Sequence, residues 1–282
     1  MSTPASQGAA AESRSPRAIE LVAIDLDGTL LRSDKRVSSA GSDAIRQCAD
    51  RGVKVVLASA RPPRSVRGVY EALQLDTISI NYNGALIHDP VRGRHLQHRP
   101  MAVSLVRKVI DAARKTDPKC LVSIEILDKW YTDQFDPTLA TETSLHFNPD
   151  FIGPLDAFLR VPVTKLMLLA PRHRMERIRE TMERRFMGKA AFAVSDDHLL
   201  QVMHKSVDKA DALGFVAKHY GVAAERVMAI GDAPNDATML KWAGLGVAMG
   251  NAWPATRQSA DVVVASNDEE GVAQALSQYV LV

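Results

Sequence analysis

The sequence is poor in cysteine, in repeats and in long apolar runs. Its 282 residues include only two cysteines, Cys48 and Cys120, without CxxC spacing. This count argues against a disulfide framework and predicts reduced thiols in a cytosolic protein. We find neither internal repeats nor heptads, which argues against a repeat array and a coiled coil. No apolar run is long enough to span a membrane, so we predict no membrane partner and exclude a transport ATPase.

An excess of one charge is also missing. The chain has 35 basic and 33 acidic residues, a formal net charge of +2. This is too little to argue for an obligatory polyanion such as DNA, so we predict a small metabolite and no nucleic acid as the partner. The hydrophobic content of 46% allows a sizeable core, and the length fits two modest domains. Residues 1–18 are rich in Ala, Ser and Pro, which predicts a disordered tail rather than a targeting peptide.

The most informative feature of the chain is a pair of carboxylates at the end of an apolar run. Asp25 and Asp27 follow Leu21–Ile24, whose continuous apolar character is typical of a buried parallel strand. Ligands of open α/β sheets bind at the carboxyl ends of such strands. A carboxylate there can attack phosphorus, provided that a cation or fixed donors cancel the repulsion between the two anions. Such helper groups should follow other strands of the same sheet.

Strands and helices alternate at both ends of the chain. A helical pattern over residues 42–50 is followed by the strand Val53–Ala58, and a third strand is predicted at Ile78–Ile80. Near the C-terminus, a helix that ends at Gly221 is followed by the strand Val227–Ile230. This alternation predicts an α/β fold with a doubly wound parallel sheet and right-handed crossovers.

The middle of the chain has a different pattern. From about Ala85 a predicted hairpin leads into an amphipathic helix and several paired strands, which together predict an inserted α+β domain. The stretch Phe135–Val163 has several prolines and no clear period, so its structure is not assigned. We expect the doubly wound pattern to resume near Leu199. The predicted core therefore comprises residues 19–86 and 194–282, and the predicted insertion comprises residues 87–193.

Further polar residues stand at predicted strand ends or helix starts. They are Ser59, Asn83, Lys209, Asp232, Asn235 and Asp236. An Asp-x-Asp pair alone is often a turn or a helix cap, and a lone Ser or Lys is usually a cap or a solvated charge. The ordered set is far more specific than any one of its members.

This set resembles the motifs of the haloacid dehalogenase superfamily of phosphotransferases, and within it the Cof-type hydrolases with an α/β cap of type two, subtype B. The resemblance covers roughly residues 19–282. It implies a Rossmann-like core with an inserted cap domain. The positions that resemble the four motifs are Asp25-Leu26-Asp27-Gly28-Thr29, Ser59, Lys209 and Gly231-Asp232-Ala233-Pro234-Asn235-Asp236. Asn83-Gly84-Ala85 and Asn267-Asp268-Glu269-Glu270-Gly271-Val272 resemble further signatures of this branch.

The resemblance also implies a role for each residue. Asp25 would be the nucleophile, and Asp27 the general acid and then the general base. Ser59 and Lys209 would bind and stabilise the phosphoryl group. The implied Mg²⁺ ligands are Asp25, Asp232 and the Asp27 carbonyl oxygen, supported by Asp236 and Asn235. The implied substrate-binding residues are Ser59, Arg61, Asn83, Lys209 and Asn235.

The chain departs from the usual motifs at two main positions. Ala60 and Ala210 stand where Gly is common, which affects the fit of the substrate more than activity. We therefore predict a Mg²⁺-dependent phosphatase that acts on a sugar phosphate or a phosphorylated cofactor, as a monomer or weak homodimer. The alternatives are a phosphomutase of the same superfamily and a non-catalytic sugar-phosphate-binding protein. His95 and His98 are interpreted as surface histidines, and the Arg-rich run 172–185 as an exposed helix face.

Overall fold

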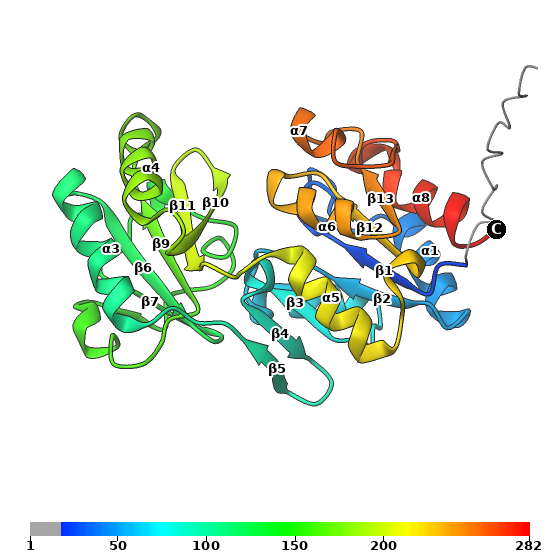
Figure 1. Cartoon of the computed structure of the whole chain (residues 1–282), viewed down its shortest axis with the longest axis horizontal. Helices are drawn as coiled ribbons and strands as arrows, with labels where there is room; N and C mark the ends of the chain where they lie inside the picture. The colour runs from blue at the N-terminus through cyan, green and yellow to red at the C-terminus, as the bar shows by residue number, and fades with distance from the viewer. Residues whose placement is uncertain (1–17) are drawn as a thin grey trace, which may run out of the picture.

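The computed structural model describes residues 18–282. The tail predicted for residues 1–18 lies, except for Ala18, outside the described residues. The chain forms two parts, each built around a sheet, at the two ends of the long axis. Two connecting segments join them (Figure 1). The segments run between His98 and Val103 and between His204 and Lys209.

A five-stranded parallel sheet forms the first part. Its strands are β1 (Leu21–Ile24), β2 (Lys54–Leu57), β12 (Val227–Gly231), β13 (Leu245–Ala248) and β14 (Val262–Val263). They lie in the order β14-β13-β12-β1-β2, and every neighbouring pair is parallel. All residues of β1 and β12 are buried, because helices cover both faces of the sheet. The predicted doubly wound fold is confirmed.

The helices of this core begin and end at residues suited to those positions. They are α1 (Ser39–Asp50), α2 (Pro63–Ala72), α5 (Lys209–Tyr220), α6 (Ala237–Trp242), α7 (Pro254–Arg257) and α8 (Gly271–Tyr279). Ser38 caps the N-terminus of α1, and Asp208 caps that of α5. Gly221 ends α5 in the left-handed conformation, as the sequence predicts. Single 3₁₀ turns of the core span Tyr82–Gly84, Ala224–Arg226, Pro234–Asp236 and Asn267–Glu269, and two more, Pro137–Leu139 and Leu155–Ala157, lie in the inserted domain.

A small antiparallel sheet extends the core. It contains β3 (Ser79–Asn81), β4 (Leu86–Asp89) and β5 (Arg94–His98) in that order. A parallel bridge between Ala58 and Ile80 connects β3 to the end of β2. The predicted hairpin therefore exists, but it pairs with β3 of the core. Its assignment to the start of the insertion is wrong, because a hairpin pattern does not reveal which third strand it joins.

The inserted domain has one antiparallel-rich sheet covered by two helices. Its strands are β6 (Leu121–Ile126), β7 (Lys129–Thr132), β8 (Phe151–Ile152), β9 (Lys165–Leu169), β10 (Ala190–Asp196) and β11 (Leu199–His204), and its helices are α3 (Val103–Thr116) and α4 (Arg172–Phe186). The strand order is β10-β11-β9-β6-β7-β8. β11 pairs antiparallel with β9, so the prediction that the doubly wound pattern resumes near Leu199 is wrong. The core resumes with α5.

Each part has its own hydrophobic core. One buried cluster contains β1, β2, β12 and their helices, and a second contains α3, α4, β6, β9 and β11. Separate cores connected by two short segments are the anatomy of two domains. Within residues 18–282, no helix combines the length and the apolar character needed to cross a membrane.

Candidate active site

Three carboxylates gather where β1 and β12 end. Asp25 directly follows β1, Asp232 directly follows β12, and Asp236 closes the turn after Asp232. β1 and β12 are neighbours with Ile24 paired to Ile230, so the residues after them leave the sheet side by side. All three side chains are buried, and one oxygen from each lies within 4.8 Å of the others. Adjacent parallel strands thus build the cluster from residues near opposite ends of the chain.

Short contacts fix the orientation of this cluster. The Thr29 hydroxyl donates to Asp232 Oδ1 at 2.7 Å. Asp236 Oδ2 accepts the backbone N–H groups of Asp232 and Ala233, both at 3.0 Å. Gly28 has φ +79°, and a Cβ there would lie 2.5 Å from Asp232 Oδ2. Only glycine allows this backbone to approach the carboxylate.

A single buried ammonium faces the carboxylates. Lys209 Nζ, at the first residue of α5, lies 2.6 Å from both Asp25 Oδ1 and Asp236 Oδ1. Burial lowers the pKa of Lys209, but the charges of Asp236 and Asp25 outweigh this effect and raise it above the usual value. Lys209 therefore stays charged and supplies a fixed positive charge at the cluster.

One ammonium cannot neutralise three carboxylates. Burial, and then the charge of Asp236, raise the pKa of Asp25 well above its ordinary value despite Lys209. Burial raises the pKa of Asp232 to about 6. Without a bound cation, keeping Asp25 and Asp232 ionised therefore costs free energy. A divalent cation would remove this cost. Since carboxylate oxygens are the ligands that Mg²⁺ prefers, the residues fit that ion.

Asp27 lies in a different environment from Asp25. Its carboxylate is held by two hydrogen bonds from Arg61, one of them from Nε to Oδ2 at 2.6 Å, and Lys35 Nζ lies 3.2 Å from Oδ1. Burial raises the pKa of Asp27, but Arg61 and then Lys35 outweigh it and lower the pKa. The side chain of Asp27 is not part of the carboxylate cluster. Its expected metal contact concerns its backbone carbonyl and stays a prediction.

Ser59 follows β2 in a loop that neighbouring residues hold from several sides. Ser59 N–H donates to the Ile80 carbonyl at 2.8 Å, and its own carbonyl accepts Asn83 N–H at 3.0 Å. Its hydroxyl oxygen accepts Arg61 N–H at 3.1 Å. The side chain is almost fully buried but reaches the cavity wall. The loop therefore offers a hydroxyl at a fixed place on the wall of the cavity that Asp25 also lines.

Asn83 has a supporting position. It adopts φ +56° in the Tyr82–Gly84 turn, and its Oδ1 accepts a hydrogen bond from Asn235 Nδ2 at 2.8 Å. Asn235 lines the cavity, whereas Asn83 is not among the lining residues. The contact of Asn83 with substrate stays a prediction, and the structure gives it the role of orienting Asn235.

A cavity of about 220 Å³ lies between the carboxylate cluster of the core and the inserted domain. The core side includes Asp25, Asp27, Ser59, Arg61, Asp232, Asn235 and Trp253, and the inserted side includes Thr141, Glu142, Thr143, Lys165, Met167, Leu199 and Gln201. Glu142 lies 3.0 Å from Lys35 and 3.5 Å from Arg61, the two residues that hold Asp27. The inserted domain thus contributes charge directly to the site.

Sequence reasoning missed several of these lining residues. Glu142 lies in the stretch that has no periodic pattern. Lys165 and Gln201 carried a signal, because each is a polar residue in a mostly apolar strand and lies two positions from an apolar residue on the same face, Met167 or Leu199. Such an isolated polar residue in a buried strand indicates a cavity wall.

The geometry of carboxylates, ammonium and hydroxyl at the strand ends agrees with the comparison to known families. The family model described as haloacid dehalogenase-like hydrolase matches residues 22–276. The chain therefore belongs to the haloacid dehalogenase-like hydrolases, and the resemblance inferred from its motifs is confirmed.

Individual relatives cover nearly the whole chain. It is 31% identical over 269 residues to the 5-amino-6-(5-phospho-D-ribitylamino)uracil phosphatase YitU of Bacillus subtilis, covering 92% of this chain and 97% of the relative. It is 30% identical over 266 residues to an HMP-PP phosphatase of Yersinia enterocolitica, covering 92% and 94%. A crystal structure of a haloacid dehalogenase-like hydrolase from Bacteroides thetaiotaomicron superposes with a TM-score of 0.81 at 27% identity, covering 92% of this chain and 99% of that one.

Proposed function

We propose that this protein is a Mg²⁺-dependent phosphatase that hydrolyses a phosphate monoester of a small metabolite through an aspartyl-phosphate at Asp25. One observation carries the proposal: Lys209 bridges Asp25 and Asp236 beside Asp232, and this buried cluster opens, next to Ser59, into a cavity between two domains. The two relatives named as phosphatases support the same reaction class.

The residues divide the first chemical step between them. Asp25 attacks phosphorus, the bond from phosphorus to the leaving oxygen breaks, and Asp27 protonates that oxygen. Lys209 and the Ser59 hydroxyl stabilise the charge that develops on the phosphoryl oxygens. When bound, Mg²⁺ would offset the repulsion between the Asp25 carboxylate and the phosphate dianion, held by Asp25, Asp232 and the Asp27 carbonyl with support from Asp236.

The second step returns the enzyme to its starting state. Asp27, now ionised, takes a proton from water, the oxygen of that water attacks phosphorus, and inorganic phosphate leaves Asp25. Arg61 holds both Asp27 oxygens and lowers the pKa of Asp27, which favours the base over the acid. We expect the substrate's leaving oxygen to displace Arg61 from one oxygen of Asp27 before protonation.

The cavity supports an uncharged leaving group. Its cationic side chains Lys35, Arg61 and Lys165 already have the carboxylate partners Glu142, Asp27 and Glu125. Met167, Leu199 and Trp253 add apolar surface to the same cavity. A polyol or an uncharged ring fits these walls better than a second anionic group, because no lining cation is free to receive it. This agrees with a sugar phosphate or a phosphorylated cofactor.

Substitution of the nucleophile tests the proposal. Asp25→Asn should reduce Mg²⁺-dependent release of phosphate from p-nitrophenyl phosphate by roughly 10³-fold or more, because Asn cannot attack phosphorus. Undiminished activity would contradict the assignment. Analysis of products separates hydrolysis from a phosphomutase, which returns the phosphoryl group to the substrate, and binding without turnover over a broad panel would identify a non-catalytic protein.

A further inference from the structure

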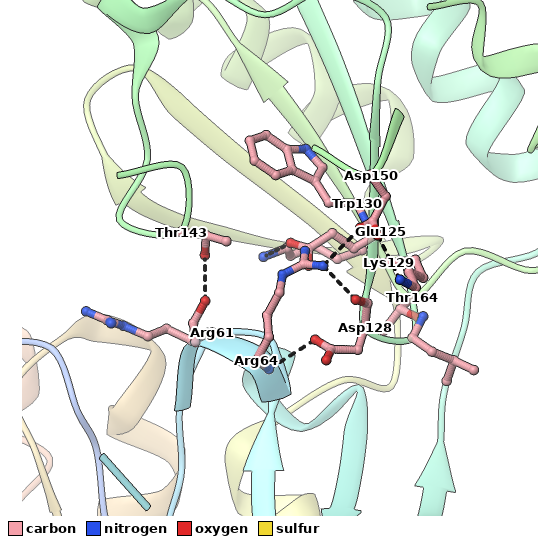
Figure 2. Close-up of polar contacts among 12 residues, drawn as sticks. Arg61, Arg64, Glu125, Asp128, Lys129, Trp130, Thr143, Asp150 and Thr164 are labelled. Atoms are coloured by element: carbon pink, nitrogen blue, oxygen red, sulfur yellow. Dashed lines mark hydrogen bonds and ion pairs between the residues drawn. The ribbon is translucent and has the colours of Figure 1, made fainter. Parts of the chain in front are cut away.

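A second cluster of buried charges lies at the boundary between the two domains, apart from the carboxylates that follow β1 and β12. Its centre is Glu125, a residue of β6 that is 1% exposed. Glu125 Oε2 accepts hydrogen bonds from Arg64 Nη2 at 3.1 Å and from the Tyr82 hydroxyl at 2.7 Å, and Oε1 lies 2.8 Å from Lys165 Nζ. Figure 2 shows Arg64 reaching from the core up to Glu125 at the base of the inserted sheet. Glu125 thus joins two residues of the core to one of the inserted domain.

Both core partners of Glu125 are attached to the loop that carries Ser59 and Arg61. Tyr82 N–H donates to the Arg61 carbonyl at 3.3 Å, so the residue that binds Glu125 by its phenol also holds the loop by its backbone. Arg64 follows Arg61 after two prolines, whose fixed φ angles make the connection stiff. A shift of Arg64 or Tyr82 is therefore transmitted to the loop.

The inserted domain also completes the first turn of α2. This helix has no side-chain cap of its own. Asp128, in the turn after β6, accepts Arg64 N–H at 3.1 Å through Oδ1, and its carbonyl accepts Arg64 Nη1 at 2.6 Å (Figure 2). A helix start leaves backbone N–H groups without partners, and a carboxylate is among the best groups to satisfy them. Contact between the two domains at this point thus adds to the stability of the start of α2.

The third partner of Glu125, Lys165, belongs to the cavity wall. Lys165 lines the cavity, whereas Glu125 does not. Lys165 Nζ also lies 5.0 Å from the centre of the Tyr82 ring, a cation–π contact. The chain of contacts therefore runs from the cavity wall of the inserted domain, through Glu125, to the Ser59–Arg61 loop of the core.

We propose that Glu125 is a positioning residue for phosphoryl transfer, which ties the cavity-lining Lys165 to Arg64 and Tyr82 and thereby fixes the loop that presents Ser59 and Arg61. This inference rests on the proposed phosphatase function. Glu125 itself touches neither the reacting phosphate nor Asp25. Its effect is geometric, because a displacement of about 1 Å in a catalytic group can reduce a rate by roughly 10²-fold.

Glu125→Gln is the variant that tests the inference, since it keeps the shape of the side chain and removes its charge. With p-nitrophenyl phosphate and Mg²⁺ we expect kcat to fall about tenfold with little change in KM, because the loop acts mainly on the transition state. We also expect faster hydrogen exchange of the amides of residues 59–66. Arg64→Met, which removes a core partner, should act in the same direction, and the double variant should lose little more than either single one.

Asp117→Asn is the matched control. Asp117 is a largely buried carboxylate of the inserted domain whose arginine partner, Arg174 at 3.0 Å, belongs to the same domain. This variant should keep kcat within about twofold and leave exchange of residues 59–66 unchanged. Wild-type kinetics and exchange in Glu125→Gln, or equal losses in Asp117→Asn, would overturn the inference. If the wild-type protein does not hydrolyse p-nitrophenyl phosphate, the proposed function fails, and the exchange measurement still decides whether Glu125 orders the loop.

Discussion

The two buried charge clusters of this protein differ in their balance. In the core, Lys209 alone faces Asp25, Asp232 and Asp236. At the domain boundary, Glu125 has two cationic partners and a phenol, and further carboxylates surround Arg64. Burying a cluster with excess negative charge costs free energy unless a cation binds to it. In a paired cluster, the charged side chains neutralise one another. A buried cluster with excess charge therefore indicates a binding site, and a buried cluster whose charges are paired indicates a structural connection.

The largest effect is expected for Lys209→Met. This change removes the ammonium that contacts Asp25 and Asp236, so we expect the free energy of unfolding in EDTA to fall by about 3–5 kcal/mol. Denaturant unfolding with EDTA and with Mg²⁺ measures the effect. A loss below about 1 kcal/mol in EDTA would mean that water or protons already neutralise the cluster. The proposed difference between the two clusters would then be wrong.

The sharpest contrast comes from removing one negative charge in each cluster. In EDTA, Glu125→Gln should lower the free energy of unfolding by about 1–3 kcal/mol, because it leaves Arg64 and Lys165 with a weaker partner. Asp232→Asn should have the opposite sign and raise it by about 1–2 kcal/mol, since it relieves repulsion among the carboxylates. Asp232→Asn should also lose the stabilisation that Mg²⁺ gives the wild type. Equal signs for the two variants would refute the distinction.

A smaller effect is expected from the charge of the substrate. Sorbitol 6-phosphate and 6-phosphogluconate share a carbon chain, but only the second carries a carboxylate at the far end. Because the cavity cations are already paired, kcat/KM for 6-phosphogluconate should be about tenfold lower, which corresponds to about 1.4 kcal/mol. Glu142→Gln should reduce this difference in kcat/KM between the two substrates, since it removes one of the two carboxylate partners of Lys35 and of Arg61. A preference for the carboxylate substrate would show that the pairs open on binding.

The smallest effect should come from an exposed ion pair. Arg46 and Asp43 on α1 are 3.1 Å apart, and both side chains are more than half exposed. Arg46→Ala should change the free energy of unfolding by less than about 0.5 kcal/mol, because solvent screens such pairs. Thermal unfolding of Arg46→Ala and of Glu125→Gln, measured side by side, compares an exposed charge with a buried one. A loss as large as that of Glu125→Gln would remove burial as the explanation.

The sequence predicts the core cluster well because its members follow strands. Asp25 and Asp232 each end an apolar run, and in a parallel sheet such ends meet at one edge. Lys209 was expected in the same place from motif order, and the structure brings it to Asp25. Their chemical roles stay predictions. The hairpin before His98 shows the limit, because its local pattern is correct and its sheet assignment is not.

Contacts between the domains could not be predicted in this way. Glu142 lies in a segment without period, and Arg64 is one of many arginines in the chain. Arg61 was expected to face the substrate, and the structure pairs it with Asp27. Which residues meet across the boundary depends on how the inserted sheet is placed on the core. That placement results from contacts between residues far apart in the chain, such as Arg64 and Glu125, which leave no local pattern.

The amino-acid sequence by itself determined the parallel core, the inserted domain and the residues that end its strands, because apolar period and strand polarity are local properties of the chain. Only the tertiary structure decided that the β4–β5 hairpin belongs to the core, which residues line the cavity and which residues contact Glu125. These depend on packing between segments far apart in the chain, where geometry rather than local preference selects the neighbours.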